Sequence, residues 1–362
     1  MTPPVRIAVL GAGLIGKRHV EHVAGEPTTE LWAVVDPSPV GEAVAGEHGT
    51  RWFPSFAAML EAGRPDGAII ATPNRLHVAN GLEAVAAGVP ALVEKPIADD
   101  VAAATTLVEA AGAAGVPLLV GHHRRHHPMI RAAKRAIEEG HLGQVLAVHG
   151  FCWFYKPDEY FDVSWRREKG AGPVFLNLIH DVDCLRYLCG DVVSVQAIES
   201  NAMRGNPVED TAVILLRFAS GALGTVTVSD AIVAPWSWEL TAGENPAYHR
   251  REESCYQIGG THGSLSIPSL DLWRNPDKRS WWEPVERKRL PHASEDPLRL
   301  QIRQFCSVIR GEEEPLVSGR EGLATLRVID AVKRSAASGE VIHLDLARKD
   351  VLAGAPAGPM LV

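Results

Sequence analysis

The chain has 362 residues, of which 46% are hydrophobic and 22% charged, and its formal net charge at pH 7 is −8. This length fits two globular domains, and the negative charge, with no basic stripe, argues against a nucleic-acid partner. Five cysteines without a Cys-x-x-Cys pair suit a reducing compartment. No apolar run is long enough for a membrane span, and the early first strand leaves no room for a signal peptide. We therefore expect a cytoplasmic protein without membrane contact.

The first strand, over 5–10, stops at a Gly-x-Gly-x-x-Gly turn that a helix-compatible segment over 17–23 follows. Strand, glycine turn and helix are the context in which this spacing binds a dinucleotide. The first glycine permits a tight turn, the second lets the backbone approach a pyrophosphate, and the third lets helix and strand pack closely. The anion then lies on the free amides of the helix N-terminus. The predicted contacts are Gly11, Gly13, Leu14, Ile15 and Gly16.

A second apolar run, over 31–35, ends in Asp36, where a ribose-binding acid belongs in such a fold. A carboxylate there accepts hydrogen bonds from both ribose hydroxyls and repels a 2′-phosphate. Pro37 and Ser38 bring no positive charge that would reverse this preference. The sequence therefore predicts NAD as the cofactor, with NADP disfavoured.

Strand and helix patterns alternate through the first third of the chain. Short apolar runs over 67–71, 90–93 and 117–121 are typical of parallel strands buried on both faces. They predict a doubly wound Rossmann domain of α/β class over 1–125, with its functional loops at one edge of the sheet. Two loops are expected beside the cofactor, and their residues are Thr72, Pro73, Asn74 and Lys95.

After His141 the pattern changes to successive strands with short turns and little helix. This predicts a second, substrate-binding α/β domain over 126–345 with a mainly antiparallel open sheet. Its free face is expected to join subunits into a homodimer or tetramer. The helical patterns within 298–337 are expected to pack back near the first domain, and 346–362 to form a tail. The expected strands are 144–152, 192–199, 211–218, 222–229 and 263–267, with a helix over 174–188.

Four motifs occur in one order along the chain. The glycine turn is followed by Ala71-Thr72-Pro73-Asn74 with His77, then by Glu94-Lys95-Pro96, and then by Asn177-Leu178-Ile179-His180-Asp181-Val182-Asp183. This combination resembles the Gfo/Idh/MocA family of nucleotide-dependent oxidoreductases over nearly the whole chain. The resemblance implies a Rossmann domain joined to an α/β domain with an open antiparallel sheet. It also implies oxidation of a hydroxyl on a sugar, inositol or related cyclic polyol, with His77 and Glu94 beside the cofactor.

In the family, the lysine of Glu-Lys-Pro and the histidine of an Asp-x-x-x-His segment act on the reacting hydroxyl. The resemblance thus assigns catalysis to Lys95 and His180. The chain departs from the pattern, since Leu176 stands four residues before His180 and Asn177 stands three before it. This departure leaves proton transfer to the histidine and the lysine.

The chemistry of these residue types fits an alcohol dehydrogenation. A histidine, with a reference pKa of about 6.5, suits the base that takes the hydroxyl proton. Lys95 would stabilise the developing alkoxide. On a regular helix Asn177, His180 and Asp183 share a face. We therefore expect Asp183 to hold one imidazole nitrogen, Asn177 to bind a substrate hydroxyl, and both residues to belong to the substrate-binding site.

The remaining predicted substrate contacts are aromatic or basic. Tyr155 and Trp165 offer faces that stack on sugar rings, and the cationic side chains suit an anionic substrate as well as a neutral polyol. These cations are Arg125, Lys156 and Arg166.

A group of histidines lies within 122–127, but we predict no metal site there. Arg124 and Arg125 interrupt the histidines, Pro128 ends any helix, and no carboxylate or cysteine adds ligands at metal-site spacing. A loop that faces cofactor and substrate fits this segment better.

Three functions remain open from the sequence. The favoured one is an NAD-dependent dehydrogenase that acts on a secondary alcohol of a sugar, inositol or similar cyclic polyol. The second is a dehydrogenase of a carboxylated cyclic diol, which the arginines and the missing aspartate suggest. The third is a dinucleotide-binding sensor without turnover.

Overall fold

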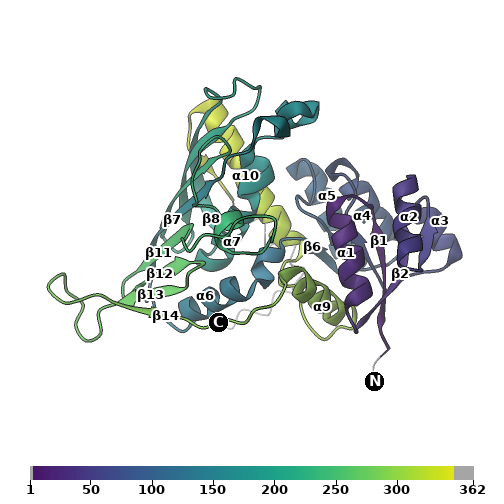
Figure 1. Cartoon of the computed structure of the whole chain (residues 1–362), viewed down its shortest axis with the longest axis horizontal. Helices are drawn as coiled ribbons and strands as arrows, with labels where there is room; N and C mark the ends of the chain where they lie inside the picture. The colour runs from purple at the N-terminus through teal and green to yellow at the C-terminus, as the bar shows by residue number, and fades with distance from the viewer. Residues whose placement is uncertain (1–2, 346–362) are drawn as a thin grey trace, which may run out of the picture.

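Two sheets, each with its own helices, lie side by side in the computed structural model, which describes residues 3–345 (Figure 1). The predicted tail over 346–362 lies outside the described residues. The N-terminal sheet is parallel, in the order β3-β2-β1-β4-β5-β6. Its strands are β1 (Val5–Leu10), β2 (Thr29–Val35), β3 (Arg51–Phe53), β4 (Gly67–Ile70), β5 (Ala91–Val93) and β6 (Leu118–Val120). The prediction of a doubly wound parallel sheet is confirmed.

Helices cover both faces of this sheet, so its central strands are buried on both sides. The strand order reverses between β1 and β4, and in such sheets ligands bind at that point, outside the carboxyl ends of the strands. The helices are α1 (Leu14–Gly25), α2 (Pro39–Glu47), α3 (Phe56–Ala62), α4 (His77–Ala86) and α5 (Val101–Ala114), with a short turn η1 (Asn74–Leu76).

The second sheet has the order β14-β13-β12-β11-β7-β10-β9-β8-β15. Strands β7 and β10 pair in parallel, and the other neighbours pair antiparallel as far as the structure describes the chain. The predicted mainly antiparallel sheet is confirmed. The strands are β7 (Val145–Trp153), β8 (Val192–Ser200), β9 (Thr211–Phe218), β10 (Leu223–Ser229), β11 (Tyr256–Gly260), β12 (Ser264–Ile267), β13 (Asp271–Arg274), β14 (Glu286–Arg289) and β15 (Ile342–His343).

Three helices pack on one face of this sheet, namely α6 (Pro128–Glu138), α7 (Ile179–Cys189) and α10 (Gly319–Ser338) (Figure 1). Pro128 begins a helix instead of ending one, which corrects the sequence-based expectation. Proline is favoured at the first helical position because its missing N–H needs no partner there. The His127 ring accepts the N–H of Met129 and caps this helix.

The helix α9 (Pro297–Ile309) packs on the Rossmann sheet although it follows the second domain in sequence (Figure 1). Its Phe305 is fully buried with strand residues of the first sheet, and Arg303 pairs with Glu26 after α1 at 3.0 Å. The helix α10 also contacts α5 and β6. Through α9 and α10 the chain therefore returns to the first domain. The two domains meet beside the carboxyl edge of the parallel sheet. Within residues 3–345, no helix is long and apolar enough to cross a membrane.

Candidate active site

The glycine turn has the geometry that a dinucleotide requires. Gly11 has φ +93°, and a Cβ there would lie 2.5 Å from the carbonyl oxygen of Ala71. A Cβ on Gly16 would lie 2.0 Å from the carbonyl oxygen of Gly11, so a side chain would force helix and strand apart. A Cβ on Gly13 would meet no described atom within 4 Å, and Gly13 caps α1 without a side-chain hydrogen bond. The free helix N-terminus therefore has room for a pyrophosphate.

Asp36 lies at the end of β2, beside this turn. Its carboxylate accepts the N–H of Ala12 and the N–H of Ser38, both at 2.8 Å. Burial alone would raise the pKa of Asp36, but the hydrogen bonds from Ser38 and Ala12 lower it below the ordinary value. The group is thus held as a carboxylate, oriented by the glycine turn, where ribose hydroxyls are expected. These residues fit the binding of NAD.

The loop after β4 lies at the same edge, but one predicted contact has another role. Both ring nitrogens of His77 lie 2.8 Å from backbone oxygens, one of Pro96 and one of Thr72. The ring is 1% exposed, so it braces the two loops against each other instead of presenting a nitrogen to the cofactor. Thr72 donates to the side chain of Asn80 at 3.0 Å. Pro73 and Asn74 begin the short turn η1 at the edge of the sheet.

Glu94 is buried at the end of β5 and contacts the first helix. Its carboxylate lies 2.7 Å from Nε2 of His19 on α1, and it also accepts the N–H of Lys95. Burial would raise the pKa of Glu94, but the hydrogen bond with His19 and the neighbouring side chains of His123 and Lys95 lower it to about 2. The pair ties the glycine-turn helix to the strand that carries Lys95. No motif of the sequence singles out His19.

Lys95 reaches across to the second domain. Its Nζ donates to the carbonyl oxygen of Leu176 at 3.3 Å, one turn before His180. That oxygen belongs to a π-helical turn, Val174–Leu178, which precedes α7. Wide turns of this kind are rare and frequently occur at functional sites. Burial lowers the pKa of Lys95, although Glu94 opposes the effect.

The residues before the π turn explain its position. The carboxylate of Glu209 accepts the N–H of Val174 at 3.0 Å and pairs with Lys333 on α10. A Cβ on Gly172 would lie 2.1 Å from Oε1 of Glu209, so only glycine lets this carboxylate approach the chain. The Gly-Ala-Gly turn therefore admits an acid that satisfies one of the first backbone donors of this helical segment, the N–H of Val174.

His180 is 9% exposed and lies among cations and other imidazoles. Its ring centroid is 5.5 Å from that of His123 and 6.3 Å from that of His122. Burial first, and then the charges of Lys95 and Arg124, lower the pKa of His180 well below its ordinary value. A neutral imidazole beside an ammonium is a combination that accepts a proton from an alcohol and stabilises the resulting oxygen.

The predicted link between Asp183 and His180 is wrong. Asp183 accepts two hydrogen bonds from Arg125, at 2.8 and 2.7 Å, and one from the hydroxyl of Thr325. The Nδ1 of His180 is buried and has no hydrogen-bond partner among residues 3–345. The buried guanidinium of Arg125 must be compensated by a full negative charge. Asp183 therefore pairs with Arg125, because its interaction with a neutral imidazole would be weaker.

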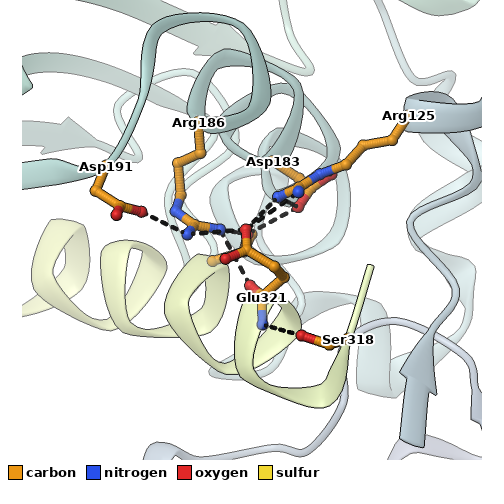
Figure 2. A network of polar contacts seen from close by, with 7 residues as sticks. Arg125, Asp183, Arg186, Asp191, Ser318 and Glu321 are labelled. Carbon is orange, nitrogen blue, oxygen red and sulfur yellow. Dashed lines mark hydrogen bonds and ion pairs between the residues drawn. The ribbon is translucent and has the colours of Figure 1, made fainter. Parts of the chain in front are cut away.

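Arg125 is likewise not available for the predicted substrate contact. Its side chain is 3% exposed, and it pairs with Asp183 and with Glu321 of α10. Figure 2 shows Glu321 between Arg125 and Arg186, the latter also bound to Asp191 at 2.8 Å. These contacts join the loop after β6, the helix α7 that carries His180, and α10. The network fixes α7 relative to the first domain.

Two other predicted cations are also engaged. The Nζ of Lys156 lies 3.3 Å from the carboxylate of Asp230, and this side chain is 7% exposed. Arg166 donates to the carbonyl oxygen of Tyr160 at 2.9 Å and lies over its ring. Arg125 and Lys156 are thus paired with carboxylates, whereas Arg166 contacts a backbone oxygen and aromatic rings.

The two predicted aromatic contacts lie in the segment between β7 and α7, which contains the short helices Asp158–Asp162 and Ser164–Arg167. Tyr155 is 42% exposed and Trp165 is 50% exposed. Their accessible rings are available for stacking. The side-chain oxygen Oδ1 of Asn177 is buried without a hydrogen-bond partner within 3–345, so it has acceptor capacity to spare.

The histidine-rich loop after β6 contains the short helix His123–His126 and lies against α7 and α9. His123 contacts Glu244 at 2.6 Å, and Arg124 pairs with Glu239 at 2.6 Å and with Asp181. Residues 3–345 contain no group of three His, Cys, Asp or Glu side chains placed to hold a metal. The motif of this loop is recognisable in the sequence. Its partners Glu239 and Glu244 are not, because the residues around them follow no regular hydrophobic pattern.

Comparison with known proteins agrees with this geometry. Residues 5–122 match the model described as an oxidoreductase family with an NAD-binding Rossmann fold, and residues 130–266 match the GFO/IDH/MocA C-terminal domain. The chain belongs to the Gfo/Idh/MocA family. As a Gfo/Idh/MocA protein it carries an NAD-binding domain and is an oxidoreductase, as the sequence predicted.

Similar proteins in this family act on sugars and polyols. Inositol 2-dehydrogenase of Rhizobium meliloti (strain 1021) is 28% identical over 94% of this chain and 99% of its own length. The 1,5-anhydro-D-fructose reductase of Ensifer adhaerens is 27% identical over 94% and 98%. The WlbA dehydrogenase from Bordetella pertussis, solved with NADH and UDP-GlcNAcA, has a TM-score of 0.75 at 28% identity and covers 95% of this chain and 99% of its own. They support a polyol oxidoreductase as the class of this protein.

Proposed function

We propose that the protein is an NAD-dependent dehydrogenase of a neutral cyclic polyol or sugar. The observation that carries the proposal is the approach of Lys95, from the first domain, to the helical turn that leads into His180 of the second. A neutral substrate is favoured over a carboxylated one because two of the three predicted basic side chains, Arg125 and Lys156, are already paired with protein carboxylates.

In this proposal each of the site residues has a separate role in binding or catalysis. The glycine turn and Asp36 hold the cofactor, which accepts the hydride when bound. The neutral imidazole of His180 takes the hydroxyl proton, and the Lys95 ammonium stabilises the oxygen as its charge grows. The side-chain oxygen of Asn177 accepts a hydrogen bond from another substrate hydroxyl. Tyr155 and Trp165 stack on the ring.

A substrate panel tests this function. Neutral cyclic polyols and aldoses, myo-inositol among them, and carboxylated cyclic diols are incubated with the protein and NAD⁺, and NADH is followed by its absorbance. We expect turnover with at least one neutral compound. Turnover confined to carboxylated diols would show that the paired cations do not define the substrate, and the second interpretation would then replace the first.

Replacement of Asp36 by alanine should erode the preference for NAD. The variant loses the charged acceptor for the ribose hydroxyls, which is worth about 1.5–3 kcal/mol, or about 10- to 150-fold in the ratio of kcat/KM for NAD over NADP. Glu42→Ala, which removes an exposed carboxylate of the nearby helix α2, serves as the control. An unchanged ratio in Asp36→Ala would contradict the assignment.

The free face of the second sheet supports a homo-oligomer, with the dimer or tetramer formed through that face. Alternate residues of β9 point away from the core, and several apolar side chains on this sheet are about half exposed or more, among them Ile198, Val213, Leu215 and Leu223. We expect Val213→Asp to lower the mass of the assembly in light scattering while near-native circular dichroism is kept. A monomeric wild type would refute this arrangement.

A further inference from the structure

The reaction releases a proton into a buried site, and the structure offers a route for it. Oxidation of the alcohol breaks the C–H bond, with the hydride passing to the nicotinamide, and breaks the O–H bond, with the proton passing to His180. His180 is 9% exposed, and its low pKa makes the imidazolium unfavourable there. The proton must therefore leave toward a nearby acceptor before the next turnover.

The nearest imidazole outside α7 with a charged partner is His123. Its ring centroid is 5.5 Å from that of His180, with the planes at 70°. Its Nε2 lies 2.6 Å from Oε1 of Glu244, whose other oxygen accepts the indole N–H of Trp238 at 2.8 Å. The neighbouring charges on this pair are Arg124 on the same loop and Glu94 at the end of β5.

Glu244 is suited to support a positive charge on His123. Burial would raise its pKa, but His123, Arg124 and Trp238 hold the pKa of Glu244 well below the ordinary value. The group thus stays a carboxylate. The His123 imidazolium that forms when a proton arrives is neutralised by it, whereas the same charge on His180 faces Lys95 and Arg124.

The pair also has an outlet to solvent. The side chains of His123 and Glu244 are 14% and 15% exposed. Glu244 lines an open hollow of about 380 Å³ together with His127, Arg250, His292 and Asp296. The chain of groups therefore runs from the catalytic imidazole to bulk water on the side of α9.

We propose that His123 and Glu244 form a proton exit, in which His180 passes the hydroxyl proton to His123, the imidazolium is held by Glu244, and the proton leaves to water in the hollow. The carbonyl product and NADH complete the balance. This inference rests on the proposed function, since it requires the alcohol to be deprotonated by His180.

The test uses His123→Asn and Glu244→Gln in the full-length protein. The second variant keeps the size of the side chain and an oxygen for Trp238, and removes the charge. Stopped-flow absorbance follows NADH formation from a neutral polyol that the wild type oxidises. Each variant should leave the first turnover unchanged and slow the following turnovers by about a hundredfold, the lower end of what proton-transfer assistance contributes, because the proton has to leave His180 before the next alcohol is deprotonated. Free imidazole in the buffer should restore part of the rate to His123→Asn, and the D₂O solvent isotope effect should rise.

Glu295→Gln is the matched control, because Glu295 lines the same hollow but pairs with Arg303. Its rate should equal that of the wild type, and NADH affinity, measured by fluorescence, should be the same in all four proteins. Wild-type turnover with unchanged variant rates, or a loss that imidazole does not restore, overturns the exit while the proposed function stands. A wild type that oxidises no neutral polyol of the panel overturns both.

Discussion

Lys95→Met is expected to abolish turnover almost completely while the fold persists. The substitution removes the only charge that β5 and its following loop bring to the Leu176 turn, and methionine has a similar length and fills the same space. Loss of one electrostatic donor to a developing oxyanion costs about 10²–10³ in kcat. Because burial already disfavours the ammonium, as the lowered pKa indicates, its loss should not destabilise the protein.

The measurement is kcat with the polyol that the wild type oxidises, together with NADH affinity and the thermal midpoint. Lys288→Met, on the exposed strand β14, is the control for removal of a lysine and should behave as the wild type. Near-normal kcat in Lys95→Met would remove the lysine from the mechanism. A loss of NADH affinity with normal kcat at saturation would instead make Lys95 a cofactor contact.

The features of the site whose geometry was predicted correctly depend on residues that lie close together in the sequence. The spacing of Gly11, Gly13 and Gly16 dictates a turn whose steric reasons lie within a few residues, and the structure gives each glycine the close approach or open space expected of it. The position of Asp36 is also predictable, because β2 runs parallel to β1 and therefore ends at the same edge of the sheet. The same logic places Lys95 after β5.

The parts that the sequence missed depend on contacts between distant segments or on subtle helical register. A π turn and an α-helix differ by one residue in the hydrogen-bond spacing, and the residues of Val174–Leu178 carry no signal that separates them. The expectation that Asn177 shares a face with His180 assumed a regular α-helix, whereas Asn177 lies in the wide turn. The partner of Asp183 is Arg125, which lies 58 residues earlier, so periodicity along α7 gave no sign of it. The short strands β13 and β14 likewise depend on pairing with their neighbours in the sheet.

Asp183→Asn should be the most destabilising single change among the site residues. It leaves Arg125 and Arg186, whose side chains are 3% and 2% exposed, with less negative charge in the network of Figure 2. Removal of one partner from a buried ion pair costs about 3–5 kcal/mol, because the remaining charge stays buried without compensation. Glu321→Gln, at a side chain that is 31% exposed, should cost clearly less. Urea unfolding followed by circular dichroism gives both values.

The pH dependence of stability separates this charge effect from a packing defect. Burial would raise the pKa of Asp183, but Arg125 and His122 lower it to about 2, below the ordinary 3.8. A depressed carboxyl pKa contributes stability that is fully present above the ordinary value and is lost as the pH falls toward the folded one. The wild type should therefore lose stability between about pH 4 and pH 2 more steeply than Asp183→Asn. Parallel profiles would mean that the carboxylate is not held by the guanidinium. In that case the brace between the β6 loop, α7 and α10 would not depend on charge, and the position of His180 would have to be set by packing alone.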